Sequence, residues 1–357
     1  MRVLVIGGSG FVGRRIVAGL GATGRHAVVS LSRHAQQEGA GGGGQYAAGG
    51  ATPWRSIQGD CRDPAVLRTA LQDVDVVVNS VMGDRSSIEE GAAQLVAAAG
   101  ARPDLRIVHL SSMAVYGRRT GLVREADAPG DSLNWYAQAK VAAEAALQRH
   151  AIAGGSVVIL RPGCVYGAGS PQWVLRIADW LRAGRLGDLG AAGDGWSNLM
   201  HVDDVVGAVI ATLQLTAEPT GRAPVYNLVA PDSPRWNRYF IDLALAIGAQ
   251  PVPRITGRRL RVEALLCAPP LKLAERIVAR GGARWPSLRA LGDRLPQGMP
   301  PSLLSLFSQQ IRLDSSASAT LPGFSWTPYE HGLVQSAGWY LDHRNLRRGH
   351  HGAGITP

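Results

Sequence analysis

Tyr136 and Lys140 stand four residues apart in the stretch NWYAQAKVAAE, and both side chains can take part in proton transfer. A tyrosine has an unperturbed pKa of about 10, which a lysine ammonium close by can lower towards neutral pH. The i, i+4 spacing places both groups on one face of a helix. Such a pair suits a reaction in which a hydroxyl proton is gained or lost while a hydride moves to or from the same carbon. The competing interpretation is two ordinary residues on a helix surface.

Three glycines, Gly7, Gly10 and Gly13, form a turn between the apolar run RVLVI and a helical pattern. Glycines at this spacing allow a tight turn, close approach of the backbone to a pyrophosphate and close packing of the helix on the sheet. The N-terminus of the helix then faces the phosphates. A purely structural turn is the alternative. Together with the tyrosine and the lysine, the turn predicts a nicotinamide dinucleotide as cofactor.

The end of the second predicted strand bears on which nicotinamide cofactor is bound. NAD sites usually place a carboxylate there to hold the ribose 2′-hydroxyl, whereas this chain reads Ser32-Arg33-His34. A serine and an arginine suit a 2′-phosphate, so the sequence predicts NADP(H). NAD(H) is the alternative if Arg33 only stacks on the adenine. Asp60, with Cys61 beside it, ends the third predicted strand and is expected to meet the adenine amine, unless it is an ordinary loop aspartate.

The composition limits the class of protein. The 357 residues carry a formal net charge of +10, and arginines are concentrated late, in RITGRRLR (254–261) and RNLRRGHH (344–351). Because no zinc-finger spacing or basic zipper accompanies them, a solvated basic face or a site for an anionic small molecule is favoured over nucleic acid. No apolar run approaches the roughly 18 residues of a membrane span, and MRVLVIGG is too short for a secretory signal. The three cysteines, Cys61, Cys164 and Cys267, offer neither a disulfide framework nor a metal site, which fits a cytoplasmic protein.

Strands and helices alternate along the first half of the chain. This pattern predicts right-handed βαβ units and an α/β fold with a doubly wound parallel sheet of the Rossmann type. Ligands in such sheets bind beyond the carboxyl ends of the strands, where the sequence places Gly7–Gly13, Ser111–Ser112 and Arg161–Gly163. The predicted strands are 2–6, 26–33, 56–60, 73–81, 105–112 and 156–163, and the predicted helices are 11–24, 65–72, 92–100 and 135–150.

The regular alternation loosens after about residue 165. A helix is expected over 201–215, a strand over 224–230 and a mobile glycine-rich loop over 39–51. The amphipathic stretch RVEALLCAPPLKLAERIVARGG belongs to a lobe expected to lie over the substrate. The predicted parts are a dinucleotide-binding domain over 1–165 to which 201–230 returns, a smaller substrate-binding lobe over 166–200 and 231–345, and a disordered tail over 346–357.

The order of the short motifs resembles that of extended short-chain dehydrogenases/reductases, the NAD-dependent epimerase/dehydratase group. The matching stretches cover nearly the whole chain in the order of that family: GGSGFVG, GD, VVVNSV, SSMAVYG, YAQAK, LRPGCVYG, HVDDVVGA and TPYEHGLVQSAGWY. The resemblance implies that Tyr136 is the proton donor or acceptor and that Lys140 binds the nicotinamide ribose and tunes Tyr136. Ser112 would take the place of the catalytic serine, with Ser111 as its structural neighbour. The resemblance also implies a homodimer, formed through a helix bundle that includes the Tyr136 helix.

Cofactor contacts are expected from the glycine turn, from the following strand ends, from the Tyr136 helix and from Pro162 and Gly163, which by resemblance border the nicotinamide. The full predicted set is Gly7, Ser9, Gly10, Phe11, Val12, Gly13, Ser32, Arg33, Asp60, Cys61, Ser80, Val81, Tyr136, Lys140, Pro162 and Gly163. Candidate substrate residues, each of which could instead fill the core, are Met113, Trp135, Tyr166, Trp173, Trp196 and Asn198.

Two departures from the family pattern weigh against a nucleotide-sugar substrate and against a dehydratase reaction. Nucleotide-sugar members usually carry an arginine where this chain has Ser197, and sugar 4,6-dehydratases place an Asp-Glu pair where it has Met113 and Ala114. The sequence therefore predicts an NADP(H)-dependent oxidoreductase that transfers hydride at a secondary alcohol or ketone of a small polar or carbohydrate-like substrate. The alternatives are a nucleotide-sugar epimerase with tightly bound cofactor, a non-catalytic NADP-sensing protein, and a protein that contacts a membrane surface through its basic segment.

Overall fold

The computed structural model describes residues 1–34, 54–131, 133–215, 221–262, 265–266, 270 and 298–352, with the backbone alone over 347–352. Two compact units make up the chain. Unit 1 consists of Met1–Ser170, Asn198–Ser233 and Ile311–Ser336, and unit 2 of Pro171–Ser197, Pro234–Gln310 and Ala337–Pro357. The predicted glycine-rich loop at 39–51, and most of the amphipathic stretch that begins at Arg261, lie outside the described residues.

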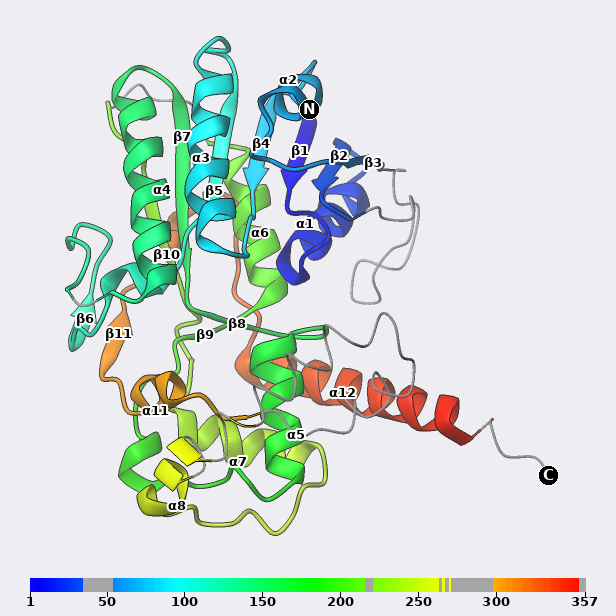
Figure 1. The fold of residues 1–357 in the computed structure, drawn as a ribbon, viewed down its shortest axis with the longest axis vertical. Coiled ribbons are helices and arrows are strands. Elements are labelled where there is room, and N and C mark those ends of the chain that lie inside the picture. The colour runs from blue at the N-terminus through cyan, green and yellow to red at the C-terminus, as the bar shows by residue number, and fades with distance from the viewer. Residues whose placement is uncertain are drawn as a thin grey trace. The chain divides into compact units, whose positions relative to one another are not determined.

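A seven-stranded sheet forms the centre of unit 1, and all of its neighbouring strands run parallel (Figure 1). The spatial order of the strands is β10 (Val225–Leu228), β7 (Ser156–Pro162), β5 (Arg106–Leu110), β4 (Val76–Asn79), β1 (Arg2–Ile6), β2 (Ala27–Ser32) and β3 (Arg55–Gln58). The strands are short, and those in the centre of the sheet, such as β4 and β5, are largely apolar and buried, as expected for strands covered on both faces.

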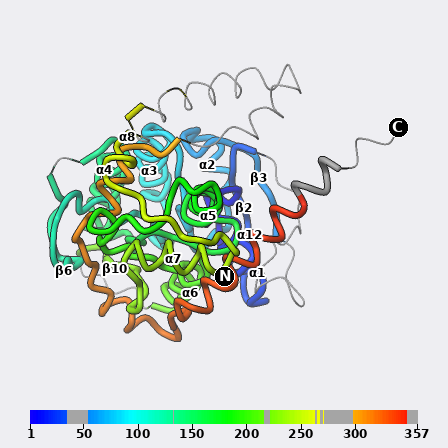
Figure 2. The backbone as a smooth tube through the Cα atoms, turned by 90° about the horizontal axis from the view of Figure 1, so that it is seen from below, coloured from blue at the N-terminus to red at the C-terminus, as the bar shows by residue number. Residues whose placement is uncertain are grey.

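Helices cover both faces of this sheet, which confirms the doubly wound α/β fold. On one face α1 (Phe11–Ala22) and α6 (Val202–Thr212) pack on a layer of valines and leucines. On the other face lie α2 (Pro64–Ala70), α3 (Arg85–Ala99) and α4 (Trp135–Ile152). Figure 2 shows α2, α3 and α4 together on one side of the unit. Because alternate side chains of each strand point to opposite faces of the sheet, they pack into two separate apolar layers.

Late segments of the chain complete unit 1. Strand β11 (Ile311–Leu313) pairs in parallel with β6 (Gly121–Val123), and β8 (Cys164–Tyr166) pairs in parallel with β9 (Leu199–His201). Short 3-10 turns, η1 (Met113–Tyr116) and η5 (Ser318–Thr320), lie in the same unit. Two small parallel pairings between segments so far apart are not visible as a periodic pattern in the sequence.

Unit 2 is mostly helical and has an aromatic centre. Trp236 lies within 5.1–6.2 Å, ring centroid to ring centroid, of four other aromatic rings. Those rings belong to Trp173, Tyr239, Phe240 and Phe307. The described elements are η2 (Pro171–Leu175), α5 (Arg176–Arg182), η3 (Gly190–Gly193), α7 (Trp236–Ala246), α8 (Gly257–Val262) and α11 (Pro301–Phe307), and α12 (Tyr329–Gly352) continues from unit 1 into unit 2 along the chain.

Local signals explain where several helices begin. Asp84 accepts a hydrogen bond from the Ser87 backbone N–H at 2.7 Å, so α3 starts at Arg85, seven residues before the predicted position. Asn134 caps α4 in the same way, through the Ala137 N–H at 2.9 Å. At the other end of the chain, α12 extends into the stretch predicted to be a disordered tail and ends at Gly352. Within the described ranges, no helix combines the length and apolar character that crossing a membrane requires.

Candidate active site

The glycine turn follows β1 and opens α1. Gly7 has a φ of +84°, a conformation that side chains other than glycine rarely adopt. A Cβ on Gly10 would lie 3.2 Å from the Gly7 carbonyl oxygen, and a Cβ on Gly13 would collide with that same oxygen. The backbone of the glycine turn therefore packs directly against the backbone at the start of α1. This is the close packing that a dinucleotide-binding turn needs.

The N-terminus of α1 can hold a phosphate. The cap residue is Gly10, and no side chain caps this helix. First-turn N–H groups of an α-helix lack partners within the helix, and the helix dipole favours negative charge there. The residues present thus fit a dinucleotide, with Ser9, Phe11 and Val12 along the same turn.

The ends of β2 and β3 carry the groups predicted to select the cofactor. Ser32 is buried and donates its hydroxyl hydrogen bond to the His34 carbonyl at 2.8 Å, whereas Arg33 is exposed. Asp60 forms a two-bond ion pair with Arg62, with Nε–Oδ1 at 3.0 Å and Nη2–Oδ2 at 2.6 Å. Hydrogen bonding to Arg62 lowers the pKa of Asp60 to about 2. The Asp60 carboxylate is therefore charged and already shared with an arginine, which the sequence pattern did not indicate.

Lys140 is buried in the first part of α4 and points to the end of the sheet. Its Nζ donates to the carbonyl of Leu110 at 2.7 Å and to that of Val81 at 3.1 Å, and it lies 6.0 Å from the centre of the Tyr136 ring. Ser112 follows β5, and its side chain hydrogen-bonds to Tyr136. The structure thus brings together Tyr136, Lys140 and Ser112, the three predicted catalytic residues.

Burial dominates the electrostatics of this group. It raises the pKa of Tyr136 above its ordinary value, although the hydrogen bond from Ser112 acts in the opposite direction. Burial also lowers the pKa of Lys140 to about 8, against the attraction of Glu144. The expected lowering of the tyrosine pKa does not emerge, because burial raises the pKa of Tyr136 by more than its hydrogen bond to Ser112 lowers it. Tyr136 is therefore a neutral phenol that holds its proton near pH 7.

The remaining predicted cofactor residues lie at or just after the ends of β3, β4 and β7. The Ser80 hydroxyl donates to the Ile6 carbonyl at 2.7 Å, and a Cβ on Gly7 would be 3.0 Å from the Ser80 carbonyl oxygen. Gly163 packs so closely on the Asn198 carbonyl that a Cβ would collide with it. Cys61 is buried, and burial raises its thiol pKa. These residues line the carboxyl ends of strands, where ligands of this fold bind.

The six predicted substrate residues differ in their surroundings. Trp135 is 50% exposed and its ring meets that of Tyr136 edge-on at 5.9 Å, while Met113 is buried beside Ser112. Tyr166 and Asn198 are buried, and the Asn198 amide bonds to the backbone of Ile311 and Leu313, so the structure uses it to hold β11. Trp173 and Trp196 belong to unit 2, where Trp173 packs on Trp236 and Trp196 on the guanidinium of Arg235.

Sequence reasoning missed a buried ion pair and a buried histidine near Lys140. Glu144 and Arg161 form an ion pair with side chains 8% and 7% exposed. His109 of β5 is fully buried, and neither ring nitrogen has a hydrogen-bond partner in the described part of the chain. A signal existed for Glu144, because an acid four residues after Lys140 faces the same side of the helix.

Comparison with known proteins decides the family. The sequence profile of the NAD dependent epimerase/dehydratase family matches residues 3–228. The chain belongs to this family. It is an NAD(P)-dependent enzyme of the extended short-chain dehydrogenase/reductase type, as the order of its motifs predicted.

Two relatives in this family have described activities. A 2-alkyl-3-oxoalkanoate reductase from Stenotrophomonas maltophilia is 28% identical over 329 residues, which cover 87% of this chain and 89% of the relative. A dTDP-6-deoxy-L-talose 4-dehydrogenase (NAD(P)(+)) from Kitasatospora kifunensis is 36% identical over 186 residues, 48% of this chain and 54% of the relative. The first similarity spans nearly both chains, and the second about half of each.

Solved structures of family members share the fold. MoeE5 in complex with UDP-glucuronic acid and NAD superposes with a TM-score of 0.66 at 22% identity, covering 98% of this chain and 100% of that one. The UDP-glucose 4-epimerase from Bifidobacterium longum in complex with NAD+ and UDP gives 0.69 at 17% identity, covering 97% and 99%. At these identities the similarity establishes the architecture of this family member.

Proposed function

We propose that this enzyme is an NADP(H)-dependent reductase that converts a ketone to a secondary alcohol, with Tyr136 as the proton donor. The observation that carries the proposal is the grouping of Tyr136, Lys140 and Ser112 at the carboxyl end of the sheet, with a tyrosine whose pKa is raised. A phenol that keeps its proton near neutral pH is ready to give it to a developing alkoxide.

Each of the three residues has a defined task in this proposal. A nicotinamide cofactor held by the glycine turn and the N-terminus of α1 would supply the hydride. Ser112 donates a hydrogen bond to the carbonyl oxygen, and Tyr136 transfers its proton to that oxygen as negative charge develops. The Lys140 ammonium stabilises the tyrosinate that remains, and its burial strengthens this attraction because the local dielectric constant is low. Proton exchange with solvent restores Tyr136.

The preference for NADP(H) is supported by the end of β2. Arg33 is exposed there, Ser32 precedes it, and the nearby carboxylate of Asp60 is paired with Arg62. An exposed arginine guanidinium is a good partner for a 2′-phosphate. The stretch Ser32-Arg33-His34 at the end of β2 offers no carboxylate to accept a hydrogen bond from a ribose hydroxyl. The glycine turn and the α1 N-terminus would hold the pyrophosphate of either cofactor.

The reductive direction is further supported by the relative that spans nearly the whole chain, since that protein is described as a 2-alkyl-3-oxoalkanoate reductase. Ser197 also supports a reductase, because it weakens the case for a nucleotide-sugar substrate. In place of the arginine of nucleotide-sugar members, this buried serine donates its hydroxyl to the Pro234 carbonyl. A homodimer remains part of the proposal, on family resemblance.

A screen of candidate substrates tests the proposal. Purified enzyme would be mixed with NADPH and, separately, with 2-alkyl-3-oxoalkanoates, simple ketones and nucleotide 4-keto sugars. The expected result is stoichiometric loss of NADPH and formation of a secondary alcohol with at least one ketone. Interconversion of two sugar epimers without net loss of cofactor would instead establish an epimerase. The absence of any turnover across the screen would count against both.

A further inference from the structure

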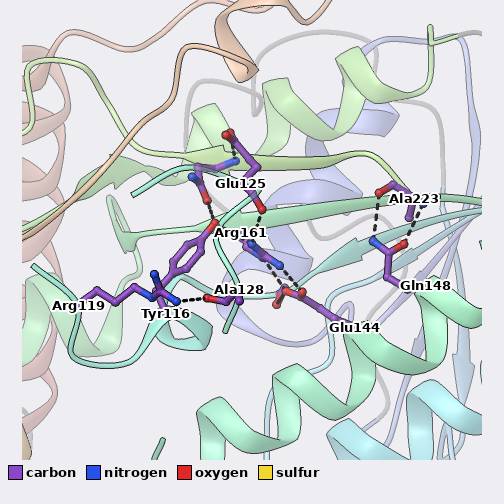
Figure 3. A network of polar contacts seen from close by, with 10 residues as sticks. Tyr116, Arg119, Glu125, Ala128, Glu144, Gln148, Arg161 and Ala223 are labelled. Carbon is purple, nitrogen blue, oxygen red and sulfur yellow. Dashed lines mark hydrogen bonds and ion pairs between the residues drawn. The ribbon is translucent and has the colours of Figure 1, made fainter. Parts of the chain in front are cut away.

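A buried ion pair joins the helix that carries Tyr136 and Lys140 to the strand beside it. Arg161 of β7 donates from Nε to Oε1 of Glu144 at 2.9 Å and from Nη2 to Oε2 at 2.6 Å. The two parallel bonds make the pair rigid as well as strong. Figure 3 shows Glu144 reaching from α4 to Arg161.

The two charged groups also use their other hydrogen-bonding positions. The Ser111 hydroxyl donates to Oε1 of Glu144. On the far side, Arg161 Nη1 donates to the Tyr116 hydroxyl at 2.7 Å, and that hydroxyl donates to Oδ1 of Asn227 at 2.7 Å. The pair is therefore the centre of a chain of five side chains that runs from the end of β5, through α4 and β7, to β10.

The pair lies close to two of the proposed catalytic residues, Lys140 and Ser112. Glu144 follows Lys140 by one turn of α4, on the same face of the helix as Tyr136 and Lys140. Ser111, which bonds to Glu144, directly precedes Ser112. A shift of Glu144 therefore moves the serine loop and the lysine helix relative to one another.

Stability alone does not account for such a pair. Removing two charges from water costs several kcal/mol, and well-packed apolar residues of similar volume often stabilise a core equally well. A polar network in which every group is hydrogen-bonded permits only one arrangement of its side chains, and an apolar core specifies its arrangement less strictly. A network with that property beside a reaction centre is suited to positioning.

We propose that Glu144 and Arg161 are positioning residues of this enzyme: their ion pair fixes Ser112 against Tyr136 and holds the Glu144 carboxylate one helical turn from Lys140. The inference rests on the proposed reductase function.

The groups that face Lys140 make its charge sensitive to Glu144. From its own helix these are Tyr136 and Glu144, and from β5 the neutral His109, whose pKa burial and Lys140 both lower. Helix α3 contributes apolar side chains to the buried cluster at this point. Arg161 reaches this region through Glu144. Glu144 is thus the anionic group that offsets the burial of the lysine.

Lys140 can be titrated directly, because Lys140 and Lys272 are the only lysines of the chain. Isotope-labelled lysine would give two side-chain NMR signals, and Lys272→Arg would assign them. In the wild type the Lys140 signal is expected to titrate at about pH 8. Glu144→Gln should move that midpoint lower by about one pH unit. An unmoved midpoint would overturn the electrostatic half of the proposal. This measurement needs no substrate, so it stands even if the proposed reaction is wrong.

The positioning half is tested with a variant that keeps the core filled. Glu144→Leu/Arg161→Met replaces both charges together, so neither is left buried alone. This double variant is expected to show a cooperative thermal transition, a kcat lower by at least about tenfold and a KM for NADPH within about threefold of the wild type. A folded double variant with the wild-type kcat would overturn the proposal.

Gln148 offers a matched control. It lies one turn further along α4, and its side-chain amide makes two hydrogen bonds, both at 3.1 Å, with the backbone of Ala223 (Figure 3). Gln148→Leu is expected to lower stability while leaving kcat and the Lys140 midpoint unchanged. Equal losses of kcat in both variants would show that the ion pair acts only through general stability.

Discussion

Tyr136 and Lys140 have shifted proton affinities for the same physical reason. Burial disfavours the charged form of each side chain, so the pKa of the phenol rises and that of the ammonium falls to about 8. At neutral pH the phenol is protonated and the lysine is still largely charged. This is the combination that proton donation to a ketone oxygen requires, followed by stabilisation of the tyrosinate.

The pKa of Lys140 predicts how the reaction depends on pH. Below about pH 8 the side chain is charged, and above it the charge is lost. Because the neutral amine does not stabilise the tyrosinate, kcat for ketone reduction should fall as pH rises through about 8. Steady-state rates over a pH series, with NADPH and ketone saturating, measure this. A kcat that stays constant well above this pH would contradict the role given to Lys140.

Arg33→Ala should separate the two nicotinamide cofactors. Loss of a charged hydrogen bond to a 2′-phosphate costs roughly 1.5–3 kcal/mol, so the Kd for NADPH should rise about tenfold to a hundredfold. The Kd for NADH should change by less than about threefold, since NADH lacks that phosphate. Fluorescence titration measures both. Arg55→Ala is the control, because Arg55 is an exposed arginine at the opposite end of the neighbouring strand β3. Equal weakening of both cofactors by Arg33→Ala would refute the NADP preference.

Helix α4 places residues that are four apart in the sequence on one face, beside the candidate active site. Tyr136, Lys140, Glu144 and Gln148 recur every four residues, and Asn134 fixes the start of the helix. The printed sequence therefore allowed the tyrosine and the lysine to be placed on one helix face. It did not reveal that the Lys140 Nζ would bind the carbonyls of Leu110 and Val81. Every residue has a backbone carbonyl, so a sequence motif cannot show which carbonyls a lysine will bind.

The close packing of the glycine turn on α1 predicts how Gly13→Ala will affect stability and NADPH binding. Gly13→Ala would place a Cβ against the Gly7 carbonyl oxygen and push α1 away from the turn. Overpacking of this kind costs about 1–3 kcal/mol. We expect a lower thermal midpoint and an NADPH Kd raised at least about tenfold, read by thermal denaturation and fluorescence titration.

Gly100→Ala is the control for this substitution. An added Cβ there would lie 3.5 Å from the Ala97 carbonyl oxygen, an ordinary contact, at the C-terminal end of α3. Stability and NADPH binding should both be unaffected. If Gly13→Ala binds NADPH as tightly as the wild type, the turn does not hold the pyrophosphate.

At the scale of the whole molecule, the alternating first half of the chain was sufficient to predict the doubly wound sheet. The closing segments were not predictable, because they depend on single side chains that meet across more than a hundred residues. Asn198 is an example: its Nδ2 donates to the Ile311 carbonyl at 2.9 Å, and its Oδ1 accepts from the Leu313 N–H at 3.0 Å. In sequence, Asn198 resembled a substrate residue.

Asn198→Leu should loosen the segment 311–336 from the rest of unit 1. The change leaves two buried main-chain groups of β11 without partners, which costs about 2–4 kcal/mol. The expected results are a lower urea midpoint and faster proteolytic cleavage within this segment. In unit 2, Asn237 makes two similar bonds, with Leu189 and Gly190, so Asn237→Leu should lower stability without exposing the segment. An unchanged midpoint for Asn198→Leu would show that its amide does not hold β11.

The central claim is that Tyr136 delivers the proton in ketone reduction. The most direct measurement compares wild type and Tyr136→Phe in a single turnover with bound NADPH and a ketone identified in the substrate screen. We expect the rate to fall by about 10²–10⁴-fold while the Kd for NADPH stays within about threefold. A Tyr136→Phe variant that reduces the ketone at the wild-type rate would contradict the account.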